Sequence, residues 1–229
     1  MAIAFFDVDE TLIATKSMFE FLGFLGRRLP SVEAEAIIAD VRCLAAAGVD
    51  RTAVNLAFWR GFAGLSRDAV RRAARLWVEE RCAAAEPFFV PAGLDRLETH
   101  QRRGDRIALV SGSAIDILQP LAERLGIDGG DILATRLMAP GGIYSGEIVP
   151  PVMIGTGKRD AAAALARSAG ADLADCHAYG DHISDLPMLE LAGHPAVVGT
   201  RGELADIARR RGWPILPGHL DARNKEAAA

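Results

Sequence analysis

The stretch IAFFDVDETL, residues 3–12, places two carboxylates at the end of an apolar run. The run is typical of a buried strand, and residues i and i+2 of a strand share a face, so Asp7 and Asp9 can point into one site. In open parallel sheets, ligands bind at the carboxyl ends of the strands. Two carboxylates this close resist joint ionisation, and a divalent cation such as Mg²⁺ would relieve the repulsion.

Other interpretations of the Asp-x-Asp pair remain open from this segment alone. A calcium loop would need its turn glycine at the position of Leu12, which excludes that reading. A solvent-facing pair fits poorly after an apolar run. The metal clamp of a nucleotide-sugar transferase has the same Asp-x-Asp pattern. A catalytic site therefore needs supporting residues elsewhere in the chain.

Composition limits the classes of function. Half of the 229 residues are hydrophobic, and the net charge of −4 argues against nucleic acid as a partner. The three cysteines, Cys43, Cys82 and Cys176, are scattered, which suits a reducing compartment and argues against disulfides or a zinc site. No apolar run approaches the length of a membrane span. We therefore expect a cytoplasmic protein, monomeric or homodimeric, that binds neither nucleic acid nor a membrane.

A long helical pattern separates the first strand, expected at residues 2–7, from the rest of the chain. Between residues 15 and 86, apolar residues recur at steps of three and four, which predicts three or four helices and no strands. After residue 87, strands and helices alternate, which predicts a parallel sheet covered on both faces. The fold class is therefore α/β, with an all-helical segment inserted after the first strand.

The elements expected after the insert follow from short apolar runs and periodic segments. Pro87 and Pro91-Ala92-Gly93 mark the boundary of the insert, and residues 221–229 form a polar tail that we expect to fray. The expected strands are 106–110, 132–135, 176–179 and 196–198, and the expected helices are 115–125, 158–168, 186–192 and 204–211.

Ser111-Gly112-Ser113 follows the expected strand that ends at Val110. A hydroxyl, a glycine amide and a helix N-terminus together can bind an anion. The alternative is that Ser113 only caps the following helix.

Lys158 stands at the start of a helix, after Gly155-Thr156-Gly157. A P-loop would need glycine at Val152 and Ser or Thr at Arg159, so this is not a P-loop. A lysine at a helix start opposes the helix dipole, which indicates a charge placed for a ligand. An exposed surface lysine is the alternative.

Gly180-Asp181-His182-Ile183-Ser184-Asp185 repeats the design of the first stretch, because carboxylates again follow a strand. Asp181 and Asp185 could both face a metal. Helix capping by Ser184 or Asp185 is the alternative, although it does not explain Asp181. The four stretches occur in order at the same end of the sheet, which predicts one joint site.

At these four stretches the sequence resembles the haloacid dehalogenase superfamily of aspartate-nucleophile phosphatases, subfamily IB. The likeness extends to about Pro214, and the helical insert is similar to the cap of the phosphoserine-phosphatase-like branch. The resemblance implies a Rossmann-like three-layer α/β/α sandwich, formed by residues 1–14 and 87–229, with a helical cap over residues 15–86. It also implies Mg²⁺-dependent hydrolysis of a small phosphorylated metabolite.

The resemblance assigns a role to each motif. Asp7 would be the nucleophile that forms an aspartyl-phosphate. Asp9 would be the general acid and base. Ser111 and the Gly112 amide would hold phosphoryl oxygens, while Lys158 supplies positive charge. Mg²⁺ would be held by Asp7, Asp181 and the Asp9 backbone carbonyl, with Asp185 orienting Lys158 or a metal-bound water.

Departures from the branch concern the leaving group. Lys16 occupies the position of a glutamate that binds the ammonium of phosphoserine, so a substrate with a second anionic group is one interpretation and a lysine outside a hinge is the other. The cap arginine of the branch falls at Phe58, with Arg60 close by. His182 and Ser184 replace glycine and asparagine and could contact the leaving group. A phosphotransferase and a catalytically silent phosphometabolite-binding protein remain alternatives.

Overall fold

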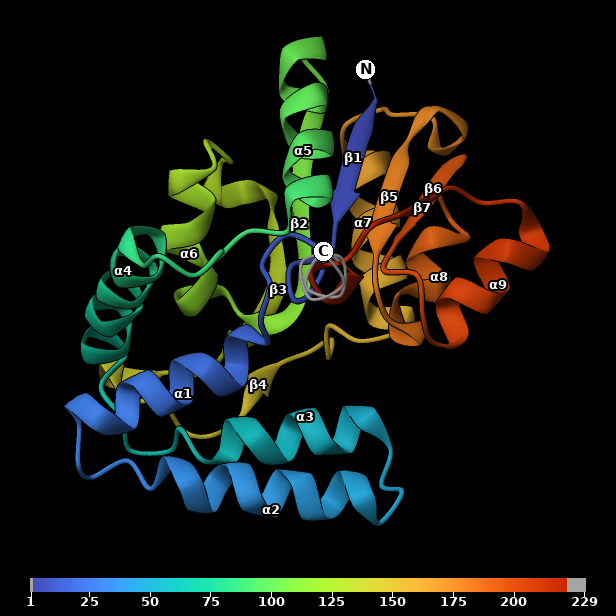
Figure 1. Ribbon diagram of the computed structural model, residues 1–229. Helices are drawn as coiled ribbons and strands as arrows, with labels where there is room; N and C mark the ends of the chain where they lie inside the picture. Colours follow the sequence, from blue (N-terminus) through green and yellow to red (C-terminus); the bar gives the residue numbers. More distant parts are fainter. Residues whose placement is uncertain (1, 222–229) are drawn as a thin grey trace.

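A seven-stranded sheet forms the centre of the structure, a computed structural model that describes residues 2–221 (Figure 1). Its strand order is β4-β3-β2-β1-β5-β6-β7, and every neighbouring pair is parallel except β3 and β4. The tail expected to fray lies outside the described residues, apart from Asp221. The strands are β1 Ile3–Phe6, β2 Arg106–Ala114, β3 Ile132–Leu137, β4 Ile148–Val149, β5 His177–Gly180, β6 His194–Val198 and β7 Ile215–Leu216.

Helices cover both faces of this sheet. The α5 and α6 side chains pack on one face, and those of α7, α8 and α9 pack on the other. This arrangement confirms the predicted α/β sandwich with a mostly parallel sheet. The helices are α1 Ser17–Arg28, α2 Ala34–Ala46, α3 Arg51–Arg60, α4 Arg67–Ala83, α5 Pro91–Arg103, α6 Ile115–Arg124, α7 Thr156–Ser168, α8 Leu186–Leu189 and α9 Glu203–Arg211.

The first strand is buried on both faces, as its apolar run predicts. Ile3 and Phe5 belong to the core cluster shared with α7 to α9, whereas Ala4 and Phe6 belong to the opposite cluster. Because none of these four side chains is exposed, β1 is held in the centre of the sheet. The residue that follows it, Asp7, is thereby delivered to the carboxyl edge.

Four helices, α1 to α4, separate β1 from α5, and we call them the helical insert. In Figure 1, α1, α2 and α3 lie beyond the carboxyl ends of the central strands, and α4 stands beside α6. The helical content of residues 17–83 agrees with the sequence, while the domain boundaries at residues 15 and 86 stay predictions. Among residues 2–221, no helix combines the length and apolar character that a membrane span requires.

The helix α5 is absent from the sequence prediction, which treated Pro91-Ala92-Gly93 only as a boundary. Pro91 occupies the first turn of the helix, where its missing N–H costs nothing. Gly93 lies against the insert junction, since a Cβ on it would meet the Thr11 carbonyl oxygen at 2.1 Å. The residues that signal a chain break therefore start a helix that packs closely on the first motif.

Two further boundaries differ from the prediction. The strand β2 continues through Ser111-Gly112-Ser113 to Ala114, with a shift of register against β3 between Ser111 and Ala114. The helix predicted at 186–192 ends at Leu189, where a turn begins. A 3₁₀ turn at Ile183–Asp185 precedes the helix. Propensity patterns do not resolve such irregular strand and helix ends.

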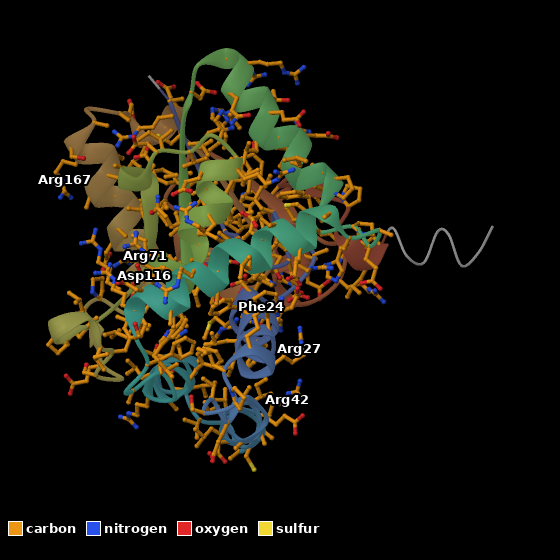
Figure 2. The ribbon with its side chains drawn as sticks, turned by 90° about the vertical axis from the view of Figure 1, so that its left-hand side faces the viewer. Phe24, Arg27, Arg42, Arg71, Asp116 and Arg167 are labelled. Atoms are coloured by element: carbon orange, nitrogen blue, oxygen red, sulfur yellow. The ribbon has the colours of Figure 1, made fainter. Side chains whose placement is uncertain are left out.

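A buried carboxylate ties α4 of the insert to α6 of the core. Asp116, only 5% exposed, accepts two hydrogen bonds from the Arg67 guanidinium, at 3.0 and 3.1 Å, and one from the Tyr144 hydroxyl at 2.8 Å. Arg71 lies 3.5 Å away from the same carboxylate (Figure 2). We call these four residues the Asp116 cluster. One turn further along, Arg75 and Glu123 form an exposed bidentate pair.

We expect Asp116→Ala to lower the free energy of unfolding by about 1–3 kcal/mol, because the buried Tyr144 hydroxyl loses its acceptor. The matched control is Glu123→Ala, which breaks an exposed pair between the same two helices and should cost less than about 1 kcal/mol. Urea denaturation measures both values. Equal losses in the two variants would contradict the assignment.

Candidate active site

The candidate site lies at the carboxyl end of β1, the strand from which later strands are added on both sides. The strand β1 has β2 on one side and β5 on the other, so the loops after these strands diverge and leave a crevice. The backbone N–H of Asp7 donates to the Tyr179 carbonyl at 2.9 Å, which fixes the end of β1 against β5. The stretches that contain Asp7, Ser111 and Asp181 therefore meet at one edge of the sheet.

The loop after Asp7 is tightly folded. Glu10 has a φ of 59°, and the N–H groups of Leu12 and Ile13 both donate to the Val8 carbonyl. A left-handed residue other than glycine costs on the order of 1 kcal/mol, which the closed loop must offset. The turn places Thr11 Oγ1 at 3.4 Å from carboxylate oxygens of both Asp7 and Asp181.

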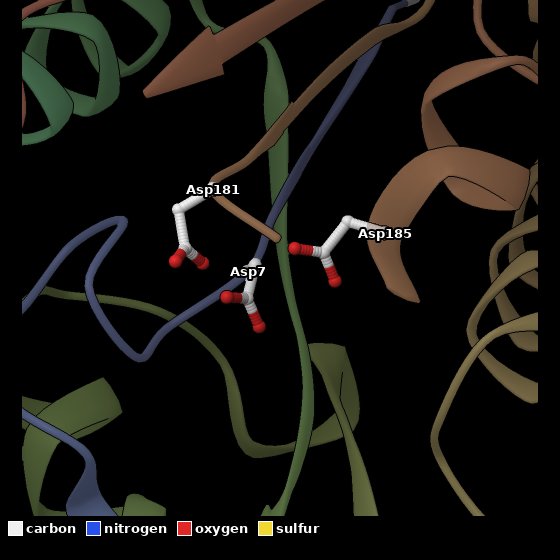
Figure 3. Close-up of side chains that lie close together, drawn as sticks. All are labelled: Asp7, Asp181 and Asp185. Atoms are coloured by element: carbon white, nitrogen blue, oxygen red, sulfur yellow. The ribbon is translucent and has the colours of Figure 1, made fainter. Parts of the chain in front are cut away.

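The segment after β5 folds into a turn that only glycine permits at its start. A Cβ on Gly180 would lie 2.6 Å from the Cβ of Asp185. The Asp185 carboxylate accepts from the His182 backbone N–H at 3.1 Å, and His182 caps the 3₁₀ turn through the Ser184 N–H. The alternative of capping by Ser184 or Asp185 holds only in part: Asp185 occupies the cap position of α8 without a side-chain cap hydrogen bond there, and its carboxylate forms a capping box with His182 at the preceding 3₁₀ turn. The turn directs Asp181 and Asp185 toward Asp7 (Figure 3).

Three carboxylates converge at this edge. Asp7, Asp181 and Asp185 each offer an oxygen within 4.8 Å of the other two. Burial, followed by the charge of Asp185, raises the pKa of Asp7 to about 7. Burial, followed by the charges of Asp7 and Asp185, raises the pKa of Asp181 to about 9. Such a set of hard oxygen donors, costly to ionise without a counter-charge, fits a divalent cation such as Mg²⁺.

Lys158 supplies part of that counter-charge from within the protein. Its Nζ lies 2.5 Å from Asp7 Oδ1 and 2.6 Å from Asp185 Oδ1, and the residue is only 4% exposed. Although burial lowers the pKa of Lys158, the carboxylates of Asp185 and Asp7 raise it above its usual value. The alternative of an exposed surface lysine is therefore wrong. Lys158 balances one of the three carboxylate charges, so a divalent cation could balance the other two.

Ser111-Gly112-Ser113 is held by hydrogen bonds from two directions. The Gly112 carbonyl accepts from Thr135 Oγ1 of β3 at 2.8 Å and from Asn55 Nδ2 of α3 at 3.2 Å. The next N–H, of Ser113, donates to Ser111 Oγ at 3.1 Å, which leaves the Ser111 hydroxyl proton available for a ligand. Sequence reasoning missed Asn55, whose only signal is a polar residue between apolar positions of a helix.

The alternative that Ser113 caps the helix is wrong. The residue at the cap of α6 is Ala114, and no side chain caps that helix. Among residues 2–221, no hydrogen-bond partner is found for the buried Ser113 Oγ.

One cavity of about 920 Å³ brings together every residue that the sequence predicts for the site. Asp9 lines it with its carboxylate tied to the start of α1, because the Ser17 N–H donates to Asp9 Oδ1 at 3.0 Å. Burial, in opposition to the Ser17 hydrogen bonds, raises the pKa of Asp9. The predicted residues on its wall are Asp7, Asp9, Lys16, Ser111, Gly112, Lys158, Asp181, His182, Ser184 and Asp185.

The residues expected near a leaving group differ in their surroundings. Lys16 is 53% exposed and pairs with Glu10 at 3.5 Å, as a lysine outside a hinge would. His182 Nε2 lies 3.0 Å from the Arg51 guanidinium, and burial, followed by Arg51, lowers the pKa of His182 to about 4. Arg51 of α3 is exposed and lines the cavity, whereas Arg60, likewise exposed, does not line it. Sequence reasoning missed Arg51.

Comparison with known proteins decides the family. Residues 4–190 match the family model described as haloacid dehalogenase-like hydrolase. The chain belongs to this family. The match covers all four motifs, so the resemblance inferred from the sequence is confirmed, and the protein is a hydrolase by family.

Relatives and solved structures agree with this family membership. The chain is 34% identical over 222 residues to a Mycobacterium tuberculosis protein named "Probable phosphatase", covering 93% of this chain and 74% of the relative. A Bordetella pertussis protein of unknown function has a similar structure, with a TM-score of 0.82, 22% identity, and coverage of 94% and 97% of the two chains. A substrate-bound phosphoserine phosphatase has a TM-score of 0.69, 19% identity, and coverage of 97% and 95%. These two likenesses show the shared fold.

We expect Mg²⁺ to raise the melting temperature above its value in EDTA, because it binds the folded carboxylates and not the unfolded chain. The shift should grow between about pH 7 and about pH 9, the pKa values of Asp7 and Asp181. Across this range the metal-free folded protein retains protons that the unfolded chain has lost, so rising pH destabilises it. Bound protons also compete with the cation.

Asp181→Asn should abolish this shift and leave the metal-free protein at least as stable, because it removes one repelling charge. The control is Asp40→Asn, an exposed aspartate of α2. Differential scanning fluorimetry measures all three proteins, and a full Mg²⁺ shift in Asp181→Asn would exclude this site.

Proposed function

We propose that the protein is a Mg²⁺-dependent phosphatase that hydrolyses a small phosphomonoester through an aspartyl-phosphate on Asp7. The observation that carries this proposal is the contact of Lys158 with both Asp7 and Asp185, beside Asp181 and within one cavity. Family membership and the phosphatase name of a relative support the same reaction. The cation would be held by Asp7 and Asp181, with Asp185 and the Asp9 carbonyl nearby.

The first step is an in-line attack of an Asp7 carboxylate oxygen on phosphorus. The new O–P bond forms as the bond from phosphorus to the leaving oxygen breaks. Lys158 favours the ionised carboxylate, which burial alone would disfavour. When bound, Mg²⁺ supplies the remaining positive charge against which a dianionic phosphoryl group can approach a carboxylate.

The transferred group is stabilised by groups already in place. The Ser111 hydroxyl has its oxygen fixed by the Ser113 N–H and can donate its proton to a phosphoryl oxygen. The Gly112 N–H and the Lys158 ammonium add donors on the same wall of the cavity. Donors held before the reaction need little reorganisation during it, which is why such groups lower the barrier.

Proton transfer falls to Asp9. Burial raises the pKa of Asp9, which favours its protonated carboxyl, and this form can give its proton to the leaving alcohol oxygen. The resulting carboxylate then takes a proton from the water that attacks the aspartyl-phosphate. The Ser17 N–H anchors one oxygen and leaves the other for this exchange.

A phosphotransferase would use the same first step and pass the phosphoryl group to an alcohol. Addition of glycerol to the assay distinguishes the two, because a hydrolase releases all the phosphate as inorganic phosphate. A silent binding protein would bind phosphate and release none. No contact among the described residues favours either alternative over hydrolysis.

We expect Asp7→Asn to lower kcat for p-nitrophenyl phosphate by about 10³-fold or more, because an amide cannot attack phosphorus. Acid-quenched wild-type protein should contain phosphate bound to residue 7, detectable by mass spectrometry. Asp40→Asn is the control and should retain full turnover. Undiminished turnover by Asp7→Asn would overturn the nucleophile assignment.

We also expect Asn55→Ala to lower kcat by about tenfold with a smaller effect on KM, because the Gly112–Ser113 peptide loses one of its two tethers. Thr135→Val removes the other tether and should act alike, while Thr135→Ser keeps the hydroxyl and should restore turnover. Steady-state kinetics measure the set. A reduced melting temperature with unaltered kcat would mean that Asn55 has a structural role alone.

A further inference from the structure

The helical insert lines part of the cavity with apolar side chains and arginines. Residues at helical spacing from two neighbouring helices face it, and each set combines apolar side chains with one arginine. The α2 set is Ile38, Val41, Arg42 and Ala45, and the α3 set is Arg51, Val54, Asn55 and Phe58. These positions follow the i, i+3, i+4, i+7 pattern of a single helix face. The faces are therefore continuous surfaces rather than scattered contacts.

The first helix adds to the apolar wall. Met18 and Phe19 of α1 line the same cavity, and the Phe19 and Phe58 rings meet edge to face with centroids 5.6 Å apart. Phe19 and Val54 remain partly exposed, so apolar surface faces the open cavity. A volume of about 920 Å³ lies in the range of sites that enclose organic molecules of some size. A leaving group with an apolar body would fill this space.

The charges on these walls are unbalanced. The carboxylate of Glu20 is engaged by Arg81 at 2.8 Å and by the Trp77 indole N–H at 3.0 Å. Among residues 2–221, no carboxylate lies within 4.0 Å of the guanidinium groups of Arg42 or Arg51. A guanidinium group prefers a carboxylate or phosphate partner, bound through two parallel hydrogen bonds.

Arg51 is the better placed of the two arginines. Within residues 2–221, the one hydrogen bond of its guanidinium is to His182 Nε2, at 3.0 Å, and His182 follows Asp181 directly in the chain. This contact links the guanidinium to the segment that carries the carboxylate cluster. Most of its N–H donors remain free for a ligand.

We propose that the leaving group of the substrate combines an apolar body with a second anionic group, a carboxylate or a phosphate, that Arg51 binds. The apolar faces of α1, α2 and α3 enclose the body. This inference rests on the proposed phosphatase function. It assigns selection of the substrate to Arg51 and not to Lys16, because the Lys16 ammonium is paired with Glu10.

The test uses synthetic phosphates that differ in one feature each. The set is ethyl phosphate, hexyl phosphate, the ω-carboxylate of hexyl phosphate and its ω-ammonium analogue, with p-nitrophenyl phosphate as the general substrate. We expect kcat/KM to rise about tenfold from ethyl to hexyl, and about tenfold again with the ω-carboxylate. The ω-ammonium analogue should be no better than hexyl phosphate.

Variants at Arg51 identify the group that binds the anion. Arg51→Gln should remove the gain from the ω-carboxylate, so that this substrate and hexyl phosphate are hydrolysed with equal kcat/KM, whereas Arg51→Lys should keep part of the gain. The matched control is Arg60→Gln, an exposed arginine of the same helix that does not line the cavity. It should behave as the wild type.

The outcomes separate the inference from the function on which it rests. Equal kcat/KM across the series, with p-nitrophenyl phosphate hydrolysed, would overturn the inference and leave the phosphatase intact. An equal loss on every substrate in Arg51→Gln would place Arg51 on the transferred phosphoryl group and likewise overturn it. Failure to hydrolyse any phosphate, with Mg²⁺ present, would reject the proposed function itself.

Discussion

The crowding of three buried or half-buried carboxylates around one buried ammonium is the constraint on which the site depends. Without Lys158, Asp7 and Asp185 would face each other with no positively charged partner, and Asp181 would add to the repulsion. Such a cluster costs folding free energy, since buried charges are rarely fully compensated. The fold sustains it by placing the site at the edge of a sheet whose central strand is buried on both faces, and by using Gly180 where a side chain would push the turn apart.

Ser111-Gly112-Ser113, the segment that we propose to bind the phosphoryl group, depends on the helical insert as well as on the core. Thr135 holds the Gly112 carbonyl from the sheet, and Asn55 holds it from α3. Hydrogen bonds to a carbonyl polarise its peptide, so the Ser113 N–H that orients Ser111 is strengthened by both. The insert therefore takes part in positioning the groups that we propose to be catalytic.

The sequence predicts the core of the site because its residues sit in local patterns. Asp7, Asp181 and Ser111 each come at or near the end of an apolar strand, and parallel strands bring such ends together. It does not predict Asn55 or Arg51, since each is a single polar position on a helix face whose orientation is set by tertiary packing. Pro91 was misjudged for a similar reason, because the same residue can end one element or begin another.

The Asp116 cluster divides the insert into parts with different freedom to change. α4 is bound to the core through Arg67 and Arg71, and its alteration would disturb folding. α2 and α3 each turn one face to the cavity, while Val41, Phe58 and Trp59 also belong to the hydrophobic core. In evolutionary terms, substitutions on these two helices can create enzymes for new metabolites while the ancestral chemistry stays in place. Diversity among descendants of such a chain is expected to accumulate between residues 34 and 60.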